Sequence, residues 1–349
     1  MSSQIKKIGI TTTIPIEILL AAGYTPVDLN NVFISDPDPG RLVNIAERDG
    51  FPLNCCTWIK GIYGVCREYG ISSVICCTSG DCSNTIMLME VLRLRGLKVT
   101  AFAYPELPNR QQMAAALDRL AQNLGTTLEA ASRVREELIP VRELALELDR
   151  LTWQQGLVSG WENHYWLVSS SDFNQDYHNY RLKLEELVAQ CRRHQPYPQD
   201  MLRIAYIGVP PVYGRDLYHY LEKNRARVVF NEIQRQFTMP RPGDCLAQQY
   251  SNYTYPYSIH QRLDDITTEL ERRRVDAVIH YVQAFCHRAI GDIIFRDGLK
   301  LPMLTLEGNN DFFLSQQVRT RIEAFLDIIQ RQRQRQKIPE ARANKFRLI

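Results

Sequence analysis

Apolar and polar positions along the first part of the chain predict strands that alternate with helices. β-branched and apolar runs predict parallel strands buried on both faces, and apolar residues at helical spacing between them predict helices. A glycine at position 96 ends the second of these helices. The predicted strands are 6–13 (KKIGITTT), 25–31 (TPVDLNN), 71–77 (ISSVICC) and 97–105 (LKVTAFAYP), and the predicted helices are 14–24 and 83–95. This alternation is typical of a parallel, doubly wound α/β sheet.

The middle of the chain has a different pattern, and the first pattern resumes after it. Apolar residues recur at helical spacing through 108–195, which predicts an all-helical section. Strands are then predicted at 203–210, 227–233, 275–282 and 301–308, with a helix at 213–224. We therefore expect an N-terminal α/β domain (1–107), a helical section (108–199) and a C-terminal α/β domain with a terminal helix (200–349).

The two α/β halves resemble each other in sequence. Residues 71–82 (ISSVICCTSGDC) and 275–286 (VDAVIHYVQAFC) share a length, an apolar strand core and a cysteine at the twelfth position. In each half, Gly-Leu-Lys then precedes the next strand, from Gly96 and from Gly298. A period of about 200 residues is too long for a solenoid, so we interpret the similarity as an internal duplication.

Composition and charge narrow the class of protein. The 349 residues carry a net charge of +3, which does not favour nucleic-acid binding, and the basic run at 331–337 is interpreted as a solvated helix end. Neither a membrane-spanning apolar stretch nor a secretion signal is apparent, so we expect a cytoplasmic protein. In that compartment the nine cysteines favour metal binding or catalysis over disulfides.

Two of the cysteines occupy positions where a ligand is expected. Cys82 and Cys286 each follow a predicted strand, and open α/β sheets bind ligands beyond the carboxyl ends of their strands. Helices predicted just after them provide backbone N–H groups that favour the thiolate form. A third thiol is expected from the doublet Cys55-Cys56, which also precedes a helix. Three thiolates suit an iron–sulfur cubane with one iron left open for chemistry.

The remaining candidates have less specific patterns. Cys66, Cys76 and Cys77 are expected to pack in the core, and Cys191 and Cys245 to be incidental. Four further candidates keep two interpretations each. Trp58 either lines the site or packs in the core, and Lys60 either lines the site or is solvated. The tyrosines of 250–257 either form an aromatic wall or pack their own loop. His287 either donates a proton or caps its helix. No phosphate-binding loop, dinucleotide motif or hydrolase nucleophile is present, and catalytic residues remain unassigned.

Several segments together resemble the 2-hydroxyacyl-CoA dehydratase superfamily, which includes benzoyl-CoA reductase subunits and double-cubane cluster proteins. They are PIEILLAAGYTPVDL, CTWIK with Gly64, GDCSNT around Cys82, AFCHR around Cys286, LPMLTLEGNND and VRTRIEAFLDII, and they span nearly the whole chain. The resemblance implies two Rossmann-like domains with an iron–sulfur cluster between them. By motif its ligands are Cys56, Cys82 and Cys286, with Cys55 as the reserve for the first position.

The resemblance also implies a cofactor, partners and a reaction. The cofactor is a [4Fe-4S] or double-cubane [8Fe-9S] cluster, and the partners are an ATP-dependent activator that donates electrons and a second subunit, identical or paralogous. The substrate is an acyl-CoA, which would lose hydroxide after one-electron reduction, or another small molecule. At 349 residues the chain is short for a dehydratase subunit and shows no acyl-CoA motif, which favours the double-cubane branch and a homodimer. Two alternatives are a non-catalytic electron carrier or redox sensor and a cluster-free, two-lobed binding protein.

Overall fold

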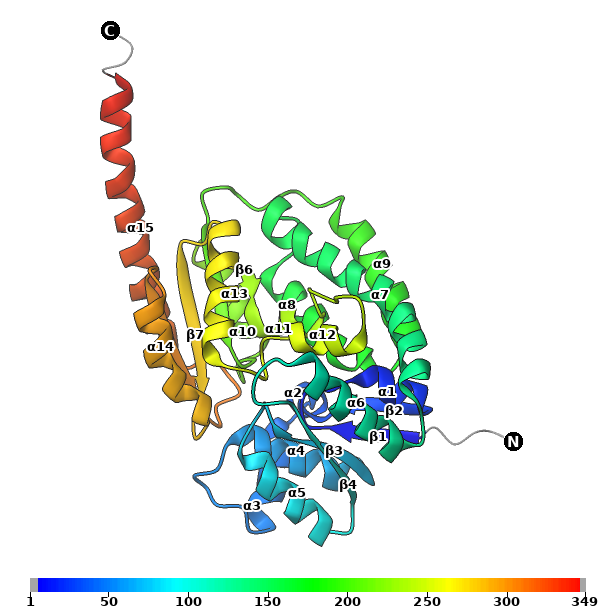
Figure 1. Cartoon of the computed structure of the whole chain (residues 1–349). Coiled ribbons are helices and arrows are strands. Elements are labelled where there is room, and N and C mark those ends of the chain that lie inside the picture. The colour runs from blue at the N-terminus through cyan, green and yellow to red at the C-terminus, as the bar shows by residue number, and fades with distance from the viewer. Residues whose placement is uncertain (1–5, 346–349) are drawn as a thin grey trace.

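The structure is a computed structural model that describes the backbone of residues 6–345 and side chains as far as residue 335. It contains two separate four-stranded parallel sheets, one in each half of the chain (Figure 1). The first sheet has the order β2-β1-β3-β4 and the second the order β6-β5-β7-β8. The strands are β1 (Lys6–Ile10), β2 (Tyr24–Asp28), β3 (Ser73–Ser79), β4 (Lys98–Ala103), β5 (Leu202–Gly208), β6 (Ala226–Asn231), β7 (Ala277–Gln283) and β8 (Met303–Gly308).

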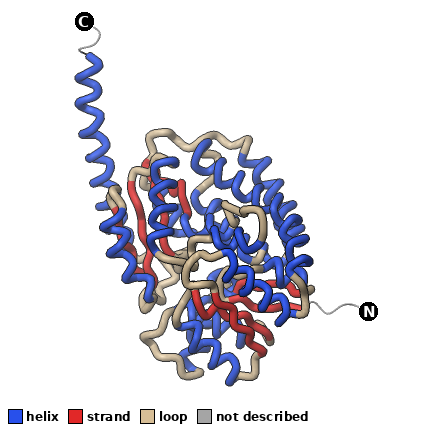
Figure 2. The backbone as a smooth tube through the Cα atoms, in the orientation of Figure 1, coloured by secondary structure: helices blue, strands red, loops and turns tan. Residues whose placement is uncertain are grey.

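The two sheets have the same topology, because in each the strand order is second, first, third, fourth along the chain. This identity confirms the predicted pair of Rossmann-like units and agrees with an internal duplication. The strands themselves lie within about three residues of the predicted ranges. Figure 2 shows the strands in two separate groups, one for each sheet.

Both faces of each sheet are buried, as a doubly wound fold requires. In β3, Ile75 and Cys77 contact one hydrophobic cluster while Val74 and Cys76 contact another on the opposite face. The helices of the first half alternate with its strands and cover these faces. They are α1 (Ile16–Ala21), α2 (Leu29–Ser35), α3 (Pro39–Arg48), α4 (Thr57–Glu68) and α5 (Asn84–Leu94).

One short strand ends earlier than the sequence predicts. Residues 25–31 were expected to be extended, but β2 ends at Asp28 and α2 begins at the next residue. The Asp28 side chain accepts a hydrogen bond from the backbone N–H of Asn30 at 2.9 Å, so it caps the new helix. The chain therefore turns from sheet to helix at a residue that faces the functional site.

The central section is helical, as predicted, and it packs against both halves. Its long helices lie along one side of the molecule in Figure 1, and a buried ion pair between Arg142 and Glu17 at 2.6 Å joins it to the first half. Its elements are α6 (Arg110–Leu124), α7 (Leu128–Arg150), the π turn η1 (Leu151–Gln155), α8 (Gly160–Val168), the 3₁₀ turns η2 (Ser169–Ser171) and η3 (Phe173–Gln175), and α9 (Tyr177–Cys191).

The second half repeats the pattern of the first and ends in a long helix. This helix, α15 (Gln316–Lys345), extends beyond the body of the molecule and carries the basic run 331–337, whose predicted helical backbone is confirmed (Figure 1). Across the described residues, no helix combines the length and apolar character needed to cross a membrane. The other elements are α10 (Arg215–Lys223), α11 (Glu232–Phe237), α12 (Leu246–Asn252), α13 (Ile259–Arg272), the 3₁₀ turn η4 (His287–Gly291) and α14 (Asp292–Gly298).

Candidate functional site

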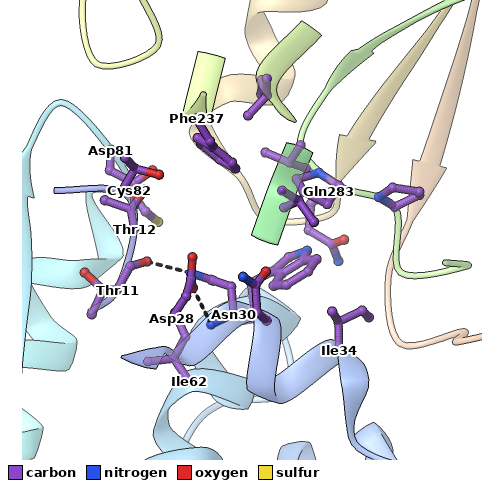
Figure 3. A pocket seen from close by; sticks show the side chains of 18 of the residues that line it. Thr11, Thr12, Asp28, Asn30, Ile34, Ile62, Asp81, Cys82, Phe237 and Gln283 are labelled. Carbon is purple, nitrogen blue, oxygen red and sulfur yellow. Dashed lines mark hydrogen bonds between the residues drawn. The ribbon is translucent and has the colours of Figure 1, made fainter. Parts of the chain in front are cut away.

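A cavity of about 410 Å³ lies where the two α/β halves and the central helices meet. Cys56, Cys82 and Cys286 all line it, each from a different loop. Figure 3 shows Cys82 and Asp81 on one side, with Gln283 and Phe237 of the second half across the space from them. The structure therefore brings the three sequence-predicted cysteines to one cavity, although they are up to 230 positions apart (286 − 56) in the chain.

Cys56 occupies the N-cap position of α4. The backbone N–H groups of Ile59 and Trp58 face its sulfur and favour the thiolate. Burial has the larger effect and raises the pKa of the Cys56 thiol to about 12, so without a cation the group is a neutral thiol. Its neighbour Cys55 is half-buried, and of the two only Cys56 lines the cavity in the described part of the chain.

Cys82 and Cys286 have equivalent settings in the two halves. Cys82 precedes α5, and the N–H of Asn84 faces its sulfur, while Cys286 is the N-cap of η4 and is faced by the N–H groups of Arg288 and Ala289. Burial raises the pKa of both thiols above the usual value for cysteine. As the sequence indicated, each thiol therefore lies at the N-terminus of a helical element.

The thiols are close enough to influence one another electrostatically. After burial and the Asp81 carboxylate, negative charge on Cys56 and on Cys286 also raises the pKa of Cys82. Charge on Cys286 likewise raises the pKa of Cys56. Because such repulsion weakens with distance, these effects agree with the placement of all three thiols at one cavity. Their assignment as ligands is still a prediction.

The donor set suits a cluster better than a single metal ion. Within residues 6–335, no three His, Cys, Asp or Glu side chains converge closely enough to hold one ion. A cubane does not require its thiolates to converge on one atom, because each thiolate binds a different iron atom and the sulfurs lie apart. Three thiols from three loops that line one cavity, with backbone N–H donors beside them, fit this requirement.

The residues before Cys82 contact the second half directly. Tyr255 donates a hydrogen bond to Asp81 Oδ1 at 2.9 Å, and Arg288 donates one to the Gly80 carbonyl at 3.0 Å. The Arg288 guanidinium also lies 4.3 Å from the centre of the Tyr255 ring. Gly80 has φ +94, and a Cβ there would meet Pro256 Cβ at 2.7 Å, so this close approach requires glycine. These contacts hold the Cys82 and Cys286 loops against each other.

The structure locates each of the secondary candidates, although the proton-donor role of His287 stays a prediction. Trp58 lines the cavity, whereas Lys60 is neither solvated nor at the site, because it is fully buried and bonded to Glu47 Oε1 at 2.6 Å. Among the tyrosines of 250–257, Tyr255 lines the cavity and the other three pack in the core. His287 is exposed and lines the cavity as the first residue of η4.

The five cysteines that were not predicted as ligands lie away from the cavity. Cys76 and Cys77 are fully buried in β3, as predicted, and Cys66 is buried on α4. Cys191 is fully buried at the end of α9, and Cys245 is the N-cap of α12, where Arg110 approaches its sulfur at 3.3 Å. Among the described residues, none of these five lines the cavity.

Sequence reasoning missed a pair of buried carboxyl groups near the cavity. Asp28 lines it, and the backbone N–H of Asp28 donates to Asp172 Oδ2 at 2.8 Å. Ser171 donates to Asp28 Oδ2 at 2.6 Å, and Asn30 bonds both Asp28 Oδ1 and the Thr11 carbonyl (Figure 3). Burial, followed by the charge of Asp28, raises the pKa of Asp172 to about 7. Asp28 is the last residue of β2, but the sequence placed it inside a strand predicted to run to residue 31, so the end of the strand gave no signal.

The wall supplied by the central helices was also missed. Trp161, His164 and Tyr165 of α8 line the cavity, and the rings of Trp161 and His164 stack with centroids 5.2 Å apart and planes 14° apart. Nothing in the periodicity of α8 distinguishes these residues from ordinary core positions. Their role at the cavity depends on tertiary packing.

Comparison with known proteins agrees with this arrangement. A family model described as 2-hydroxyglutaryl-CoA dehydratase, D-component, matches residues 11–329, which include all three cavity cysteines and every strand except β1. No curated protein matches the chain. The match covers far more than half of the sequence, and the fold agrees with what the resemblance implied. The chain belongs to the 2-hydroxyglutaryl-CoA dehydratase D-component family.

Proposed function

We propose that the chain is the iron–sulfur catalytic component of a low-potential dehydratase or reductase that depends on an ATP-driven activator. The observation that carries the proposal is the convergence of Cys56, Cys82 and Cys286 on one cavity between the two halves. Family membership supports a dehydratase-type enzyme component. The cluster, the activator and the substrate belong to the proposal.

The three thiolates would hold the cluster at the cavity wall. When bound, the cluster would supply a single low-potential electron to the substrate. The chain's own residues would do the rest. Trp58 and Phe237 present apolar surface that excludes water, while Asp28 and Asn30 offer polar groups that orient a substrate.

We propose four further features that the three cysteines do not address. The electron donor is a separate ATP-dependent activator protein, and the second subunit is another copy of the chain or a paralogue. The substrate is an acyl-CoA or another small molecule. The cytoplasm is the proposed location, and nucleic acid and membrane are not proposed partners.

Anaerobic reconstitution with iron and sulfide tests the cluster. We expect a brown protein with about four irons per chain for one cubane, or about eight for a double cubane. A chain that stays colourless and iron-free under these conditions would contradict the proposal and favour a cluster-free binding protein.

Turnover is tested separately with the reconstituted protein. A matched activator, ATP and a strong reductant are supplied with 2-hydroxyglutaryl-CoA, and electron consumption and product are followed. Substrate-dependent electron consumption supports an enzyme. Cluster reduction without consumption, for this and for small reducible substrates, would favour an electron carrier or redox sensor instead.

A further inference from the structure

A chain of buried hydrogen bonds leads from an ion pair to the cavity wall at His164. The five side chains before His164 are Arg273, Asp149, Asn163, Asn231 and Tyr218, and all are at most 3% exposed. His164 itself is 5% exposed and lines the cavity from α8. Each link has a direction, because some of these groups can only donate and others can only accept.

The chain begins at a carboxylate. Arg273 donates to both oxygens of Asp149, at 2.9 and 2.5 Å. Burial tends to raise the pKa of Asp149, but the Arg273 charge and its hydrogen bonds outweigh burial and lower it. Asp149 is therefore ionised and can only accept.

The side-chain amides of two asparagines continue the hydrogen-bond chain, and each is oriented by its partners. Asn163 Nδ2 donates to Asp149 Oδ1 at 3.0 Å and to Thr152 Oγ1 at 3.1 Å, so its oxygen faces the other way. That oxygen accepts from Asn231 Nδ2 at 2.7 Å. The same nitrogen donates to the Gly160 carbonyl at 3.2 Å, so the orientation of the Asn231 amide is determined twice. Asn231 consequently presents its oxygen to Tyr218.

The last links determine which ring nitrogen of His164 carries the proton. Tyr218 donates its only hydroxyl proton to Asn231 Oδ1 at 2.8 Å, and its oxygen lies 2.7 Å from His164 Nδ1. With no second proton on Tyr218, Nδ1 must be the donor. Burial lowers the pKa of His164 to about 3, so the ring is neutral and holds one proton. That proton is on Nδ1, and Nε2 carries a free lone pair.

Gln234 is the one neighbour that bears on this tautomer. Its Nε2 lies 3.0 Å from His164 Nδ1, and its Oε1 is buried without a partner among the described residues. The two ends of an amide are told apart only by their hydrogen-bond partners. Turning the Gln234 amide end for end places its oxygen against Nδ1–H and gives that oxygen a donor.

We infer that His164 Nε2 is a hydrogen-bond acceptor in the cavity that positions a ligand by its hydroxyl or amide N–H group. The inference rests on the proposed function only in taking the cavity as the substrate site. Nε2 makes no hydrogen bond to the described residues, and the stacked Trp161 ring holds the imidazole in place. A 2-hydroxyacyl-CoA carries both kinds of donor, the hydroxyl on its acyl group and the amides of its CoA arm.

The tautomer can be tested without any ligand. The full-length chain is labelled with ¹⁵N-histidine, and the His164 signals are identified among the seven histidines by their loss in His164→Gln. We expect shifts typical of an Nδ1–H, Nε2-bare ring that do not change between pH 5 and 8. An Nε2–H ring, or titration within that range, would overturn the inference even if the cluster and its chemistry were confirmed.

Binding tests the role of the lone pair. Calorimetry with 2-hydroxyglutaryl-CoA compares the wild-type chain with His164→Phe, which keeps an aromatic ring but removes the acceptor. We expect about tenfold weaker binding, the effect of one lost hydrogen bond. His164→Gln, whose side-chain oxygen reaches a similar position, should restore part of the affinity. His178→Gln on exposed α9 is the matched control and should bind as the wild type does.

Glutaryl-CoA, which lacks the hydroxyl, separates the two sources of the donor. If the ligand hydroxyl donates, His164→Phe weakens only 2-hydroxyglutaryl-CoA, and if a CoA amide donates, it weakens both probes equally. Either result supports the inference. Equal affinity of wild type and His164→Phe for both probes, or no binding of either probe by the wild type, would overturn it. Failure of the proposed function is distinguished by the iron analysis, which does not depend on His164.

Discussion

Cys82 and Cys286 are each the third residue after the third strand of their sheet, since β3 ends at Ser79 and β7 at Gln283. Both thiols also lie at the start of a helical element that follows the strand. The two halves therefore bring cysteines in equivalent positions to one cavity, and their role as cluster ligands is a prediction. The third cysteine, Cys56, has no counterpart among the cysteines of the second half.

The two members of the cysteine doublet should differ in their effect on bound iron. Of the two, only Cys56 lines the cavity in the described part of the chain, so Cys56→Ala should lose most of the iron after anaerobic reconstitution, and Cys55→Ala should keep most of it. Iron counting and the visible spectrum measure both. Cys245→Ala serves as a control away from the cavity. A larger loss of iron from Cys55→Ala would assign the ligand to Cys55. Equal loss from both variants would assign it to neither residue in particular.

The position of Cys56 should depend on close packing beneath its helix. A Cβ at Gly64 of α4 would lie 2.3 Å from the Leu42 carbonyl oxygen of α3, a backbone atom that cannot move aside cheaply. Gly64→Ala should therefore destabilise the protein by about 1–3 kcal/mol and lower the iron retained, because α4 carries Cys56 at its N-cap.

Urea denaturation and iron analysis measure the two effects of Gly64→Ala. Gly40→Ala in α3 is the matched control, because the nearest atom to its Cβ would be a side-chain oxygen at 3.2 Å. Wild-type stability in Gly64→Ala would show that the two helices can separate without cost.

The Asp28–Asp172 pair should make stability depend on pH. Burial and the neighbouring Asp28 charge raise the pKa of Asp172 from 3.8 to about 7, so the folded state retains a proton that the unfolded state releases. Stability from this group is full below the unfolded value and is lost as pH rises towards the folded value. As the pH rises from about 4 to about 7, the thermal midpoint of the wild type should therefore decrease relative to that of Asp172→Asn.

Thermal denaturation of both proteins across this range checks the prediction. Asp176→Asn, at the exposed N-cap of α9, is the control for a neighbouring carboxyl group. Parallel curves for the wild type and Asp172→Asn would show that Asp172 ionises normally in the folded protein.

The buried cation Arg273 should be essential for stability. It is 1% exposed and bonds both Asp149 and Glu269, so Arg273→Met leaves the buried Asp149 anion without its ion-pair partner and removes one of the cations that pair with Glu269. We expect a loss of about 3–5 kcal/mol in the free energy of unfolding by urea. Arg272→Met, at a half-exposed position that also pairs with Glu269, should cost about 1 kcal/mol or less. Similar losses from both would contradict the burial argument.

The alternation of apolar runs and helical periodicity identified nearly every strand of the fold. Strands buried on both faces need continuous apolar sequence, so β3 and β7 could be recognised from their residues alone. The strand order within each sheet was not predicted and comes from the structure. The domain limits at 107 and 199 stay predictions, because the central helices share a hydrophobic cluster with the first sheet.

Local signals were less reliable where a short polar side chain or a buried charge decided the structure. The run 25–31 looked extended, yet the Asp28 cap begins a helix within it. Lys60 was assigned to solvent or to the site, but Glu47 lies within hydrogen-bond reach and draws it into the core. The Asp28 cap bonds a residue only two positions away, whereas the Lys60 partner lies 13 positions away, and in neither case do residue type and periodicity reveal the pairing.

The sequence by itself determined the family, the two parallel sheets and the three candidate cysteines that the structure brings to one cavity. These follow from apolar periodicity and from residues whose chemistry is specific at short range. Only the tertiary structure decided that α8 closes the cavity, that Asp28 lies beside Asp172, and that His164 presents its bare nitrogen to the site. Those relationships depend on hydrogen bonds between segments far apart in the chain, and their geometry exists only once the two halves and the central helices have packed together.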